Sequence, residues 1–328
     1  MLTALFRQDR PAALLAVPLL VVVCCGPAWS APLPVQQPAM PLYALLIGMM
    51  GSMAWLSGLV AFLLITGIAV QLVFLANDLE LFDRRNHLTA LLLPVLMGLL
   101  PHGPVLDPAL AGMPLVVWAL RRAWMARGRS SSGWLFDSGV LIGLAALFHL
   151  PYAFMLVVLS ASNAVMRSFQ WRDHVVPLIG LLTTLFLCRG TLFVLGSDAW
   201  RPMGTLTVHH HPDPGMPERY TYLLAGTLVL FATWASWAFA SSYRRSVIHG
   251  KNLRSAWLAF GSAASVLLGF EFLLTRSASP VLGAVPLALF LSYPLLQPPR
   301  PWLAGAAVLW LVAMALWSQW ALGLSSAA

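Results

Sequence analysis

The sequence predicts an all-α bundle of about eleven membrane-spanning helices that forms one integral membrane domain over residues 1–328. Of the 328 residues, 59% are hydrophobic and only 9% are charged, and the mean hydropathy is +0.80. No water-soluble domain of this size would show such values. Apolar segments follow one another and are separated by short polar gaps. The longest of these gaps, 197–219, is predicted to be the longest external loop.

Arginine and lysine residues occur almost entirely in alternate gaps between the apolar segments. Because cytoplasmic loops retain Lys and Arg, this asymmetry predicts a multi-pass inner-membrane protein with its N-terminus inside and its C-terminus outside. The gaps assigned to the cytoplasm hold Arg84, Arg85, Arg121, Arg122, Arg127, Arg129, Arg167, Arg172, Arg244, Arg245, Lys251, Arg254 and Arg300. The opposite gaps hold only Arg201, Arg219 and Arg276. This topology explains the net charge of +8, since arginines meet anionic headgroups, and no nucleic-acid partner is expected.

The first apolar segment, 12–25, has two possible fates. Arg7 and Arg10 precede it, and the residues 28–31 resemble a signal-peptidase site. Cleavage would leave ten spans with a new N-terminus outside, whereas retention gives eleven spans with the same orientation downstream. Retention is favoured, because multi-spanning proteins commonly keep the first helix as an anchor.

The second segment, 42–76, carries no charge and is too long for one span but barely long enough for two. Two crossings would move most of the basic residues to the outside. We therefore expect one tilted span over 55–76, preceded by an outer interfacial or re-entrant stretch that contains Gly48 and Gly51. The Pro-rich stretch 32–41 is then an external loop.

Three of the following segments, 87–100, 134–150 and 151–166, are short for spans. Short spans are tolerated where neighbouring helices shield them or where they line a cavity. The tight connections at 101–104 and 149–151 predict two outer hairpins, above which a cavity would open to the outside. The last five segments have normal lengths: 174–195, 220–240, 256–274, 281–296 and 302–322.

Several short motifs stand in an order that resembles an uncharacterised family of multi-pass membrane proteins, a domain of unknown function found mainly in Bacteroidota. They are Leu135-Phe136-Asp137-Ser138-Gly139, Leu141-Ile142-Gly143-Leu144-Ala145, Leu147-Phe148-His149-Leu150-Pro151, Phe169-Gln170-Trp171-Arg172-Asp173 and Val176-Pro177-Leu178-Ile179-Gly180. The resemblance covers residues 80–185 and is weaker over 244–302. His149 departs from the family's pattern, in which an aromatic residue is expected. The resemblance implies a helical membrane fold but no activity and no catalytic residues.

The architecture is also similar to the core of the C-type glycosyltransferases, which use polyprenyl-phosphate sugars. The shared features are a Gly-x-x-x-Gly pattern and short spans after two outer hairpins. Those enzymes typically carry an acidic residue in the first external loop. Here that loop, 28–41, contains no Asp or Glu, which counts against a catalytic role of that type.

Polar residues near the outer ends of the segments are the candidate site residues. Arg189 lies within the outer half of segment 174–195, where its guanidinium would hold a lipid phosphate or would reach the headgroups or an acid. The outer hairpins carry His102, Asp107 and His149, with Tyr152 one turn further on. Asp107 and His102 are the candidate catalytic residues, as general base and orienter, and Arg189, His149 and Tyr152 are the candidate substrate-binding residues. Asp107 before Pro108 is equally a helix cap.

Other polar residues receive structural interpretations. We expect Glu271 to pair with Arg276, the alternative being a proton carrier or a catalytic base. We expect Asp137 to begin a helix or to pair with Arg127 or Arg129. His209, His210 and His211 are adjacent, and since neighbouring residues of an extended chain point apart, no dedicated metal site is predicted. No Walker loop, dinucleotide turn or nucleophile elbow is present, so no cofactor is expected.

These observations favour a role in cell-envelope glycan or glycolipid assembly at the outer face of the inner membrane. The expected partners are membrane lipids, a polyprenyl-phosphate-linked substrate and a further membrane protein. In this hypothesis Arg189 binds the lipid phosphate, and Asp107 or His102 activates the acceptor. Two alternatives stay open: a non-catalytic membrane subunit of an envelope or secretion complex, and a small-solute transporter.

Overall fold

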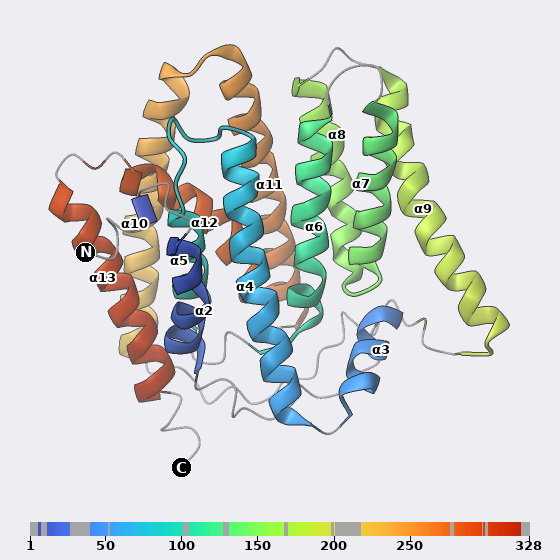
Figure 1. Ribbon diagram of the computed structural model, residues 1–328, viewed down its shortest axis with the longest axis horizontal. Coiled ribbons are helices and arrows are strands. Elements are labelled where there is room, and N and C mark those ends of the chain that lie inside the picture. The colour runs from blue at the N-terminus through green and yellow to red at the C-terminus, as the bar shows by residue number, and fades with distance from the viewer. Residues whose placement is uncertain are drawn as a thin grey trace.

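The computed structural model describes residues 6–7, 12–26, 40–51, 53–100, 105–126, 131–166, 170–197, 200, 218–275, 279–296, 298 and 301–322. Over these residues the chain consists of helices joined by short turns, and no β-strand occurs among them. Figure 1 shows the helices side by side in one bundle, most of them along a common direction. The prediction of an all-α fold is confirmed.

The helices follow the predicted apolar segments in order. They are α2 (Ala12–Cys25), α3 (Pro41–Met50), α4 (Ala54–Asp78), α5 (Leu88–Met97), α6 (Pro108–Met125), α7 (Ser131–Ala146), the 3-10 helix η2 (Leu150–Phe154), α8 (Met155–Met166), α9 (Trp171–Val194), α10 (Glu218–Arg245), α11 (Ile248–Thr275), α12 (Pro280–Leu296), α13 (Pro301–Leu316) and the π-helical turn η4 (Trp317–Leu322).

Five of the described helices are long and apolar enough to cross a membrane by length and composition. These stretches are Trp55–Asp78, Trp171–Val194, Glu218–Arg245, Gly250–Leu274 and Trp302–Trp320. The chain therefore has the make-up of a helical membrane protein. The count of eleven spans and the location in the inner membrane stay predictions.

The long uncharged stretch 42–76 is divided at Gly51. This residue has a φ of 58°, in the left-handed region that glycine adopts without steric cost. On one side α3 has only ten residues, too few to span a bilayer. On the other side α4 continues unbroken for 25 residues. The structure thus agrees with one span preceded by a separate short segment, which Figure 1 places at the lower end of the bundle.

The short helix α5 lies at the centre of the bundle. All ten of its residues are buried, against α2, α4, α12 and α13. Carbonyl groups left free at the end of a helix need partners where water is absent. Gln319 donates to the carbonyls of Gly98 and Leu100, and the Tyr220 hydroxyl donates to that of Leu99. Shielding by neighbours therefore explains how so short a segment is tolerated.

The first helix α2 is part of this packing. Its residues Val17, Val21, Cys24 and Cys25 are fully buried where it packs against α4 and α5. The Cys25 thiol lies 3.7 Å from the carbonyl oxygen of Pro94. All three cysteines are free, and Cys24 and Cys25 are buried as expected for small apolar residues.

Basic residues gather at one end of the bundle, the upper end in Figure 1, which we call the basic end. It is formed by the 79–87 loop, the end of α6, the start of α9, and the ends of α10 and α11 that face each other, and it carries Arg84, Arg121, Arg122, Arg172, Arg244, Arg245 and Lys251. The opposite end holds η2 and the start of α6. Residues from alternate gaps of the sequence therefore lie together, as the predicted topology requires.

The interpretation of Asp137 was wrong. The helix α7 begins at Ser131, so Asp137 lies in its second turn rather than at its start. Its carboxylate pairs with Arg122 Nη2 at 2.5 Å, and Arg127 and Arg129 lie outside the described residues. Because Arg122 is in the last turn of α6, the pair joins two consecutive helices at the basic end.

Helices α7 and α9 approach each other through glycines. A methyl group added at Gly180 would lie 2.5 Å from the carbonyl oxygen of Phe136, and one at Gly143 would lie 2.7 Å from Cβ of Thr184. One at Gly139 would overlap the carbonyl of Pro177. The two backbones are thus in direct contact, a form of packing that small residues permit in membrane helices.

Candidate functional site

A buried pair of polar side chains, His149 and Glu271, forms the centre of the candidate site. His149 immediately precedes η2, and Glu271 lies near the C-terminal end of α11. The imidazole Nε2 lies 2.5 Å from Glu271 Oε1. The two residues are only 6% and 7% exposed. Removing such groups from water is unfavourable unless they are paired, so the pairing accounts for their burial.

The second carboxylate oxygen of Glu271 is also bonded. The backbone N–H of Ser279, just before α12, donates to Oε2 at 3.3 Å. The pair is therefore fixed by three elements, η2, α11 and the start of α12. A carboxylate that is held by a backbone amide can orient the imidazole beside it.

Asp107 lies beside this pair, at the start of α6. Its Oδ1 accepts a hydrogen bond from the backbone N–H of Leu110 at 2.5 Å, so its interpretation as a helix cap is confirmed. Burial raises the pKa of Asp107 from 3.8 to about 6, opposed by the Ser279 hydroxyl and the Leu110 amide, and the nearby Glu271 raises it further. Asp107 is thus both a cap and a titratable group next to the buried pair.

Two tyrosines enclose the site. The ring of Tyr152 packs edge-on against His149, with 5.1 Å between ring centroids, and its hydroxyl donates to the carbonyl of Ala109 at 2.6 Å. From α3, the Tyr43 hydroxyl donates to the carbonyl of Leu106 at 3.1 Å. Both tyrosines are buried. The helix α3 therefore covers the turn that leads into Asp107, while Tyr152 joins η2 to α6.

An apolar groove of about 370 Å³ runs beside the pair. Its lining residues come from η2 and α11, and they are Leu150, Pro151, Phe154, Val266, Leu267 and Phe270. Leu150 follows His149 in the chain, and Phe270 precedes Glu271. The groove is therefore lined by the chain neighbours of the pair, although neither His149 nor Glu271 lines it. Its apolar surface suits a hydrocarbon chain.

The arrangement has the parts of an acid–base site. When Glu271 accepts the proton carried by Nε2, the other ring nitrogen, Nδ1, is the basic one. In the described part of the chain neither ring nitrogen has a hydrogen-bond partner of good geometry, so Nε2 meets Glu271 as a close polar contact and Nδ1 is unpartnered. Such an imidazole can take a proton from a hydroxyl group, and the carboxylate stabilises the imidazolium that forms.

A metal ion has no evident place in this arrangement. Among the described residues, no three His, Cys, Asp or Glu side chains come together in a group that could hold one. The adjacent histidines 209–211 lie outside the described residues.

The predicted site residues are brought together only in part. Asp107, His149 and Tyr152 converge, whereas His102 lies outside the described residues. Arg189 is exposed on α9, and its guanidinium lies 5.9 Å from the ring centroid of Trp200. Figure 1 shows this end of α9 leaning away from the bundle. No contact that is described for Arg189 joins it to the His149–Glu271 pair.

Glu271 is the candidate site residue that the sequence alone does not place among the predicted catalytic or binding residues. It lies against His149, and its predicted partner Arg276 lies outside the described residues, so that pairing stays a prediction. The signal that could have found it is a carboxylate within an apolar segment, which is a functional hypothesis by default. Its partner could not be found in this way, because His149 belongs to a different segment.

The raised pKa of Asp107 predicts a specific dependence of stability on pH. Between pH 4 and 6 the folded protein holds a proton that the unfolded chain has released, so raising the pH through this range removes stability. We expect the unfolding temperature of the wild type, relative to Asp107→Asn, to fall over this interval. Asparagine is a suitable reference because it caps helices but does not titrate. Parallel pH profiles of the two proteins would contradict the prediction.

Comparison with known proteins does not add to this description: no family model matches the chain, and no curated protein or solved structure shows significant similarity to it.

Proposed function

We propose that this protein is an inner-membrane transferase that uses a lipid-linked donor, a polyprenyl-phosphate sugar, in cell-envelope glycan or glycolipid assembly. The observation that carries the proposal is the buried His149–Glu271 pair, which lies next to Asp107 and beside an apolar groove. The groove offers a place for the polyprenyl chain. The donor class follows from the architectural resemblance to the C-type glycosyltransferases, in spite of the missing acidic residue in the first loop.

The orientation in the membrane is part of the proposal. We infer eleven spans, with the basic end in the cytoplasm, because Arg and Lys are retained on that side. The end that carries His149 and Glu271 then lies near the outer face. Polyprenyl-phosphate sugars would reach it from the outer leaflet, and their chains would enter the groove between η2 and α11.

In the proposed reaction, His149 accepts the proton of the acceptor hydroxyl group, and the oxygen attacks the anomeric carbon of the donor. The bond between this carbon and the phosphate oxygen breaks, and polyprenyl phosphate leaves with the electron pair. Glu271 holds the imidazole and stabilises the imidazolium, which then releases its proton to water. Asp107 is the second titratable group beside the pair, and its effect on the reaction depends on whether its carboxyl group is protonated.

The test compares His149→Gln with the wild type in lipid nanodiscs supplied with a panel of undecaprenyl-phosphate hexoses. Glutamine keeps a donor for Glu271 but has no basic nitrogen. We expect the release of undecaprenyl phosphate to fall about 100-fold or more, while the unfolding temperature changes little. The matched control is His87→Gln, which removes a buried histidine at the basic end and should retain activity.

A second arm tests the groove. Val266→Trp would fill it and should weaken binding of undecaprenyl phosphate, as measured by native mass spectrometry. If His149→Gln left the turnover unchanged, the His149–Glu271 pair would have a structural role only. If no donor is turned over, and undecaprenyl phosphate binds wild type and Val266→Trp equally, the transferase proposal is wrong.

One observation favours a second candidate, a non-catalytic membrane subunit. In the apolar stretch of α9 only 17% of the residues are buried within the protein, a smaller share than in any of the other four candidate spans. Phe186, Leu187 and Phe193 are among its exposed side chains. A partner helix would find an apolar surface here. A subunit of this kind would tolerate His149→Gln but would lose its partner when Phe186 and Leu187 are changed to serine.

A further inference from the structure

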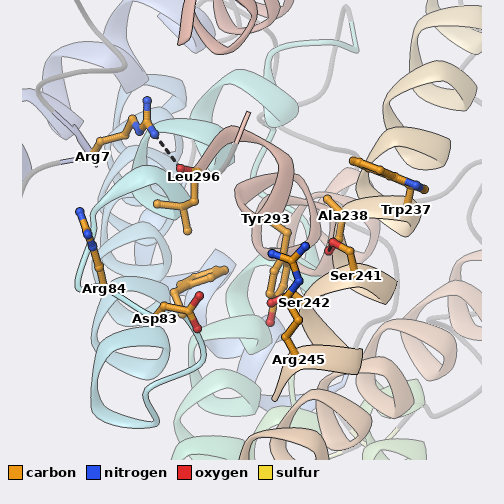
Figure 2. Close-up of a pocket in the computed structure, with 11 residues that line it drawn as sticks. Arg7, Asp83, Arg84, Trp237, Ala238, Ser241, Ser242, Arg245, Tyr293 and Leu296 are labelled. Atoms are coloured by element: carbon orange, nitrogen blue, oxygen red, sulfur yellow. Dashed lines mark hydrogen bonds between the residues drawn. The ribbon is translucent and has the colours of Figure 1, made fainter. Parts of the chain in front are cut away.

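A large cavity lies at the basic end of the bundle, away from the candidate site. Its volume is about 780 Å³, twice that of the apolar groove. It is enclosed by the 79–87 loop, α10, α12 and the N-terminal Arg7. Figure 2 shows Arg7 and Arg84 on one side and Ser241 and Arg245 on the other, with Tyr293 between them.

The cavity carries a surplus of positive charge. Arg7, Arg84 and Arg245 line it, and Asp83 is the one carboxylate in its described lining. The charge of Asp83 is already countered by Arg254, whose Nη2 lies 3.7 Å from Oδ1. Within the described residues, no carboxylate lies within ion-pair distance of Arg84 or Arg245. Their charges are therefore available to a ligand.

The base of the cavity is rigidly built. Arg254 is only 5% exposed, and it donates to the carbonyl oxygen of Ser242 at 2.6 Å. Its guanidinium lies 5.7 Å from the ring centroid of Tyr293. At the rim, Arg7 Nη2 donates to the carbonyl of Leu296 at 2.6 Å, which joins the N-terminal segment to α12. These contacts join α10, α11, α12 and the N-terminal segment to one another without using Arg84 or Arg245.

The chemistry of the lining fits a phosphate group. Guanidinium groups hold phosphate oxygens in paired, charge-assisted hydrogen bonds, and Ser241 and Ser242 add hydroxyl groups. Trp237, Ala238 and Leu296 supply an apolar wall, next to which an acyl chain would be buried. Basic pockets between membrane helices on the cytoplasmic side suit anionic headgroups.

We propose that this cavity binds the phosphate group of an anionic membrane lipid. Free phosphate has the same chemistry and is the alternative source. The site binds rather than reacts, because its described lining contains no histidine and its carboxylate is paired. The proposal does not rest on the transferase function.

The test measures lipid binding to the purified full chain by native mass spectrometry. The probes are dioleoylphosphatidylglycerol, the zwitterionic dioleoylphosphatidylcholine and inorganic phosphate. The test variant is Arg84→Gln with Arg245→Gln. The matched control is Arg85→Gln with Arg244→Gln, which removes the same charge from the same loop and helix but outside the cavity lining. All four arginines are exposed, and unfolding temperatures would verify that both proteins are folded.

We expect phosphatidylglycerol to bind the wild type in preference to phosphatidylcholine. The test variant should lose affinity about tenfold or more, since each arginine contributes a charge-assisted hydrogen bond. The control variant should lose less than about twofold. If the two variants lost affinity equally, binding would depend on the general surface charge and not on this cavity, and the proposal would be overturned. If inorganic phosphate bound but phosphatidylglycerol did not, and the test variant lost this binding, the cavity would be a phosphate site. A lipid as the source of the phosphate would then be overturned.

Discussion

Replacing Gly139 with alanine is expected to abolish most of the folded protein. The added methyl group would overlap the carbonyl of Pro177 in the neighbouring helix, where backbone meets backbone. No side chain can move aside, so α7 and α9 would have to separate along their whole contact. Overpacking a well-packed core typically costs about 1–3 kcal/mol, and this contact should lie at or above the upper limit. The measurements are the yield of monodisperse protein and its unfolding temperature.

The matched control lies on the neighbouring helix. Gly190 in α9 has nothing within 4 Å of the position that a Cβ would occupy. Gly190→Ala should therefore be neutral or stabilising by up to about 1 kcal/mol, because alanine favours the helical conformation more than glycine does. If both variants behaved alike, the glycine contact between α7 and α9 would have no structural importance.

Replacing Glu271 with alanine should destabilise the protein by about 1–3 kcal/mol, because it leaves the polar ring of His149 buried without its partner. The exposed pair Arg121–Asp78 gives the comparison: its two atoms also lie 2.5 Å apart, but the side chains are 37% and 33% exposed. Asp78→Ala should cost only about 0–1 kcal/mol. Unfolding free energies in mixed micelles would measure both effects.

A double-mutant cycle separates the pair from the packing around it. Once Glu271 has been removed, His149→Ala should cost much less than it does in the wild type, since the unpaired imidazole is already unfavourable. Simple additivity of the two substitutions would show that the pair does not interact energetically. This test concerns stability alone, so it is independent of any transferase activity.

Much of the fold was predictable because its causes are local. The division of segment 42–76 depended on Gly51 and on the length that a span requires, and the structure has both the short helix α3 and the single long helix α4. Asp107 before Pro108 carried the signal of a helix cap, and it accepts the expected amide hydrogen bond. The interpretation of Asp137 was wrong because α7 begins earlier, at Ser131, where no clear apolar boundary marks the start of a helix.

The candidate site was predictable only in part. His149 and Tyr152 are three residues apart, so their contact follows from one turn of chain. Glu271 lies in a distant segment, and its contact with His149 depends on how α11 packs beside η2. The same holds for the cavity at the basic end, where Arg7 meets α12 through the carbonyl of Leu296.

The sequence by itself determined the helical class, the order of the segments and the gathering of basic residues in alternate loops. These properties depend on how favourably each apolar segment passes from water into the membrane, and on which adjoining loops keep their Lys and Arg in the cytoplasm. Both depend only on residues close together in the sequence. The tertiary structure alone decided that His149 meets Glu271 and that Arg84 and Arg245 face one cavity. The physical reason is that such contacts depend on the rotation of each helix about its axis and on the fit between neighbouring helices, which is a property of the whole packed bundle.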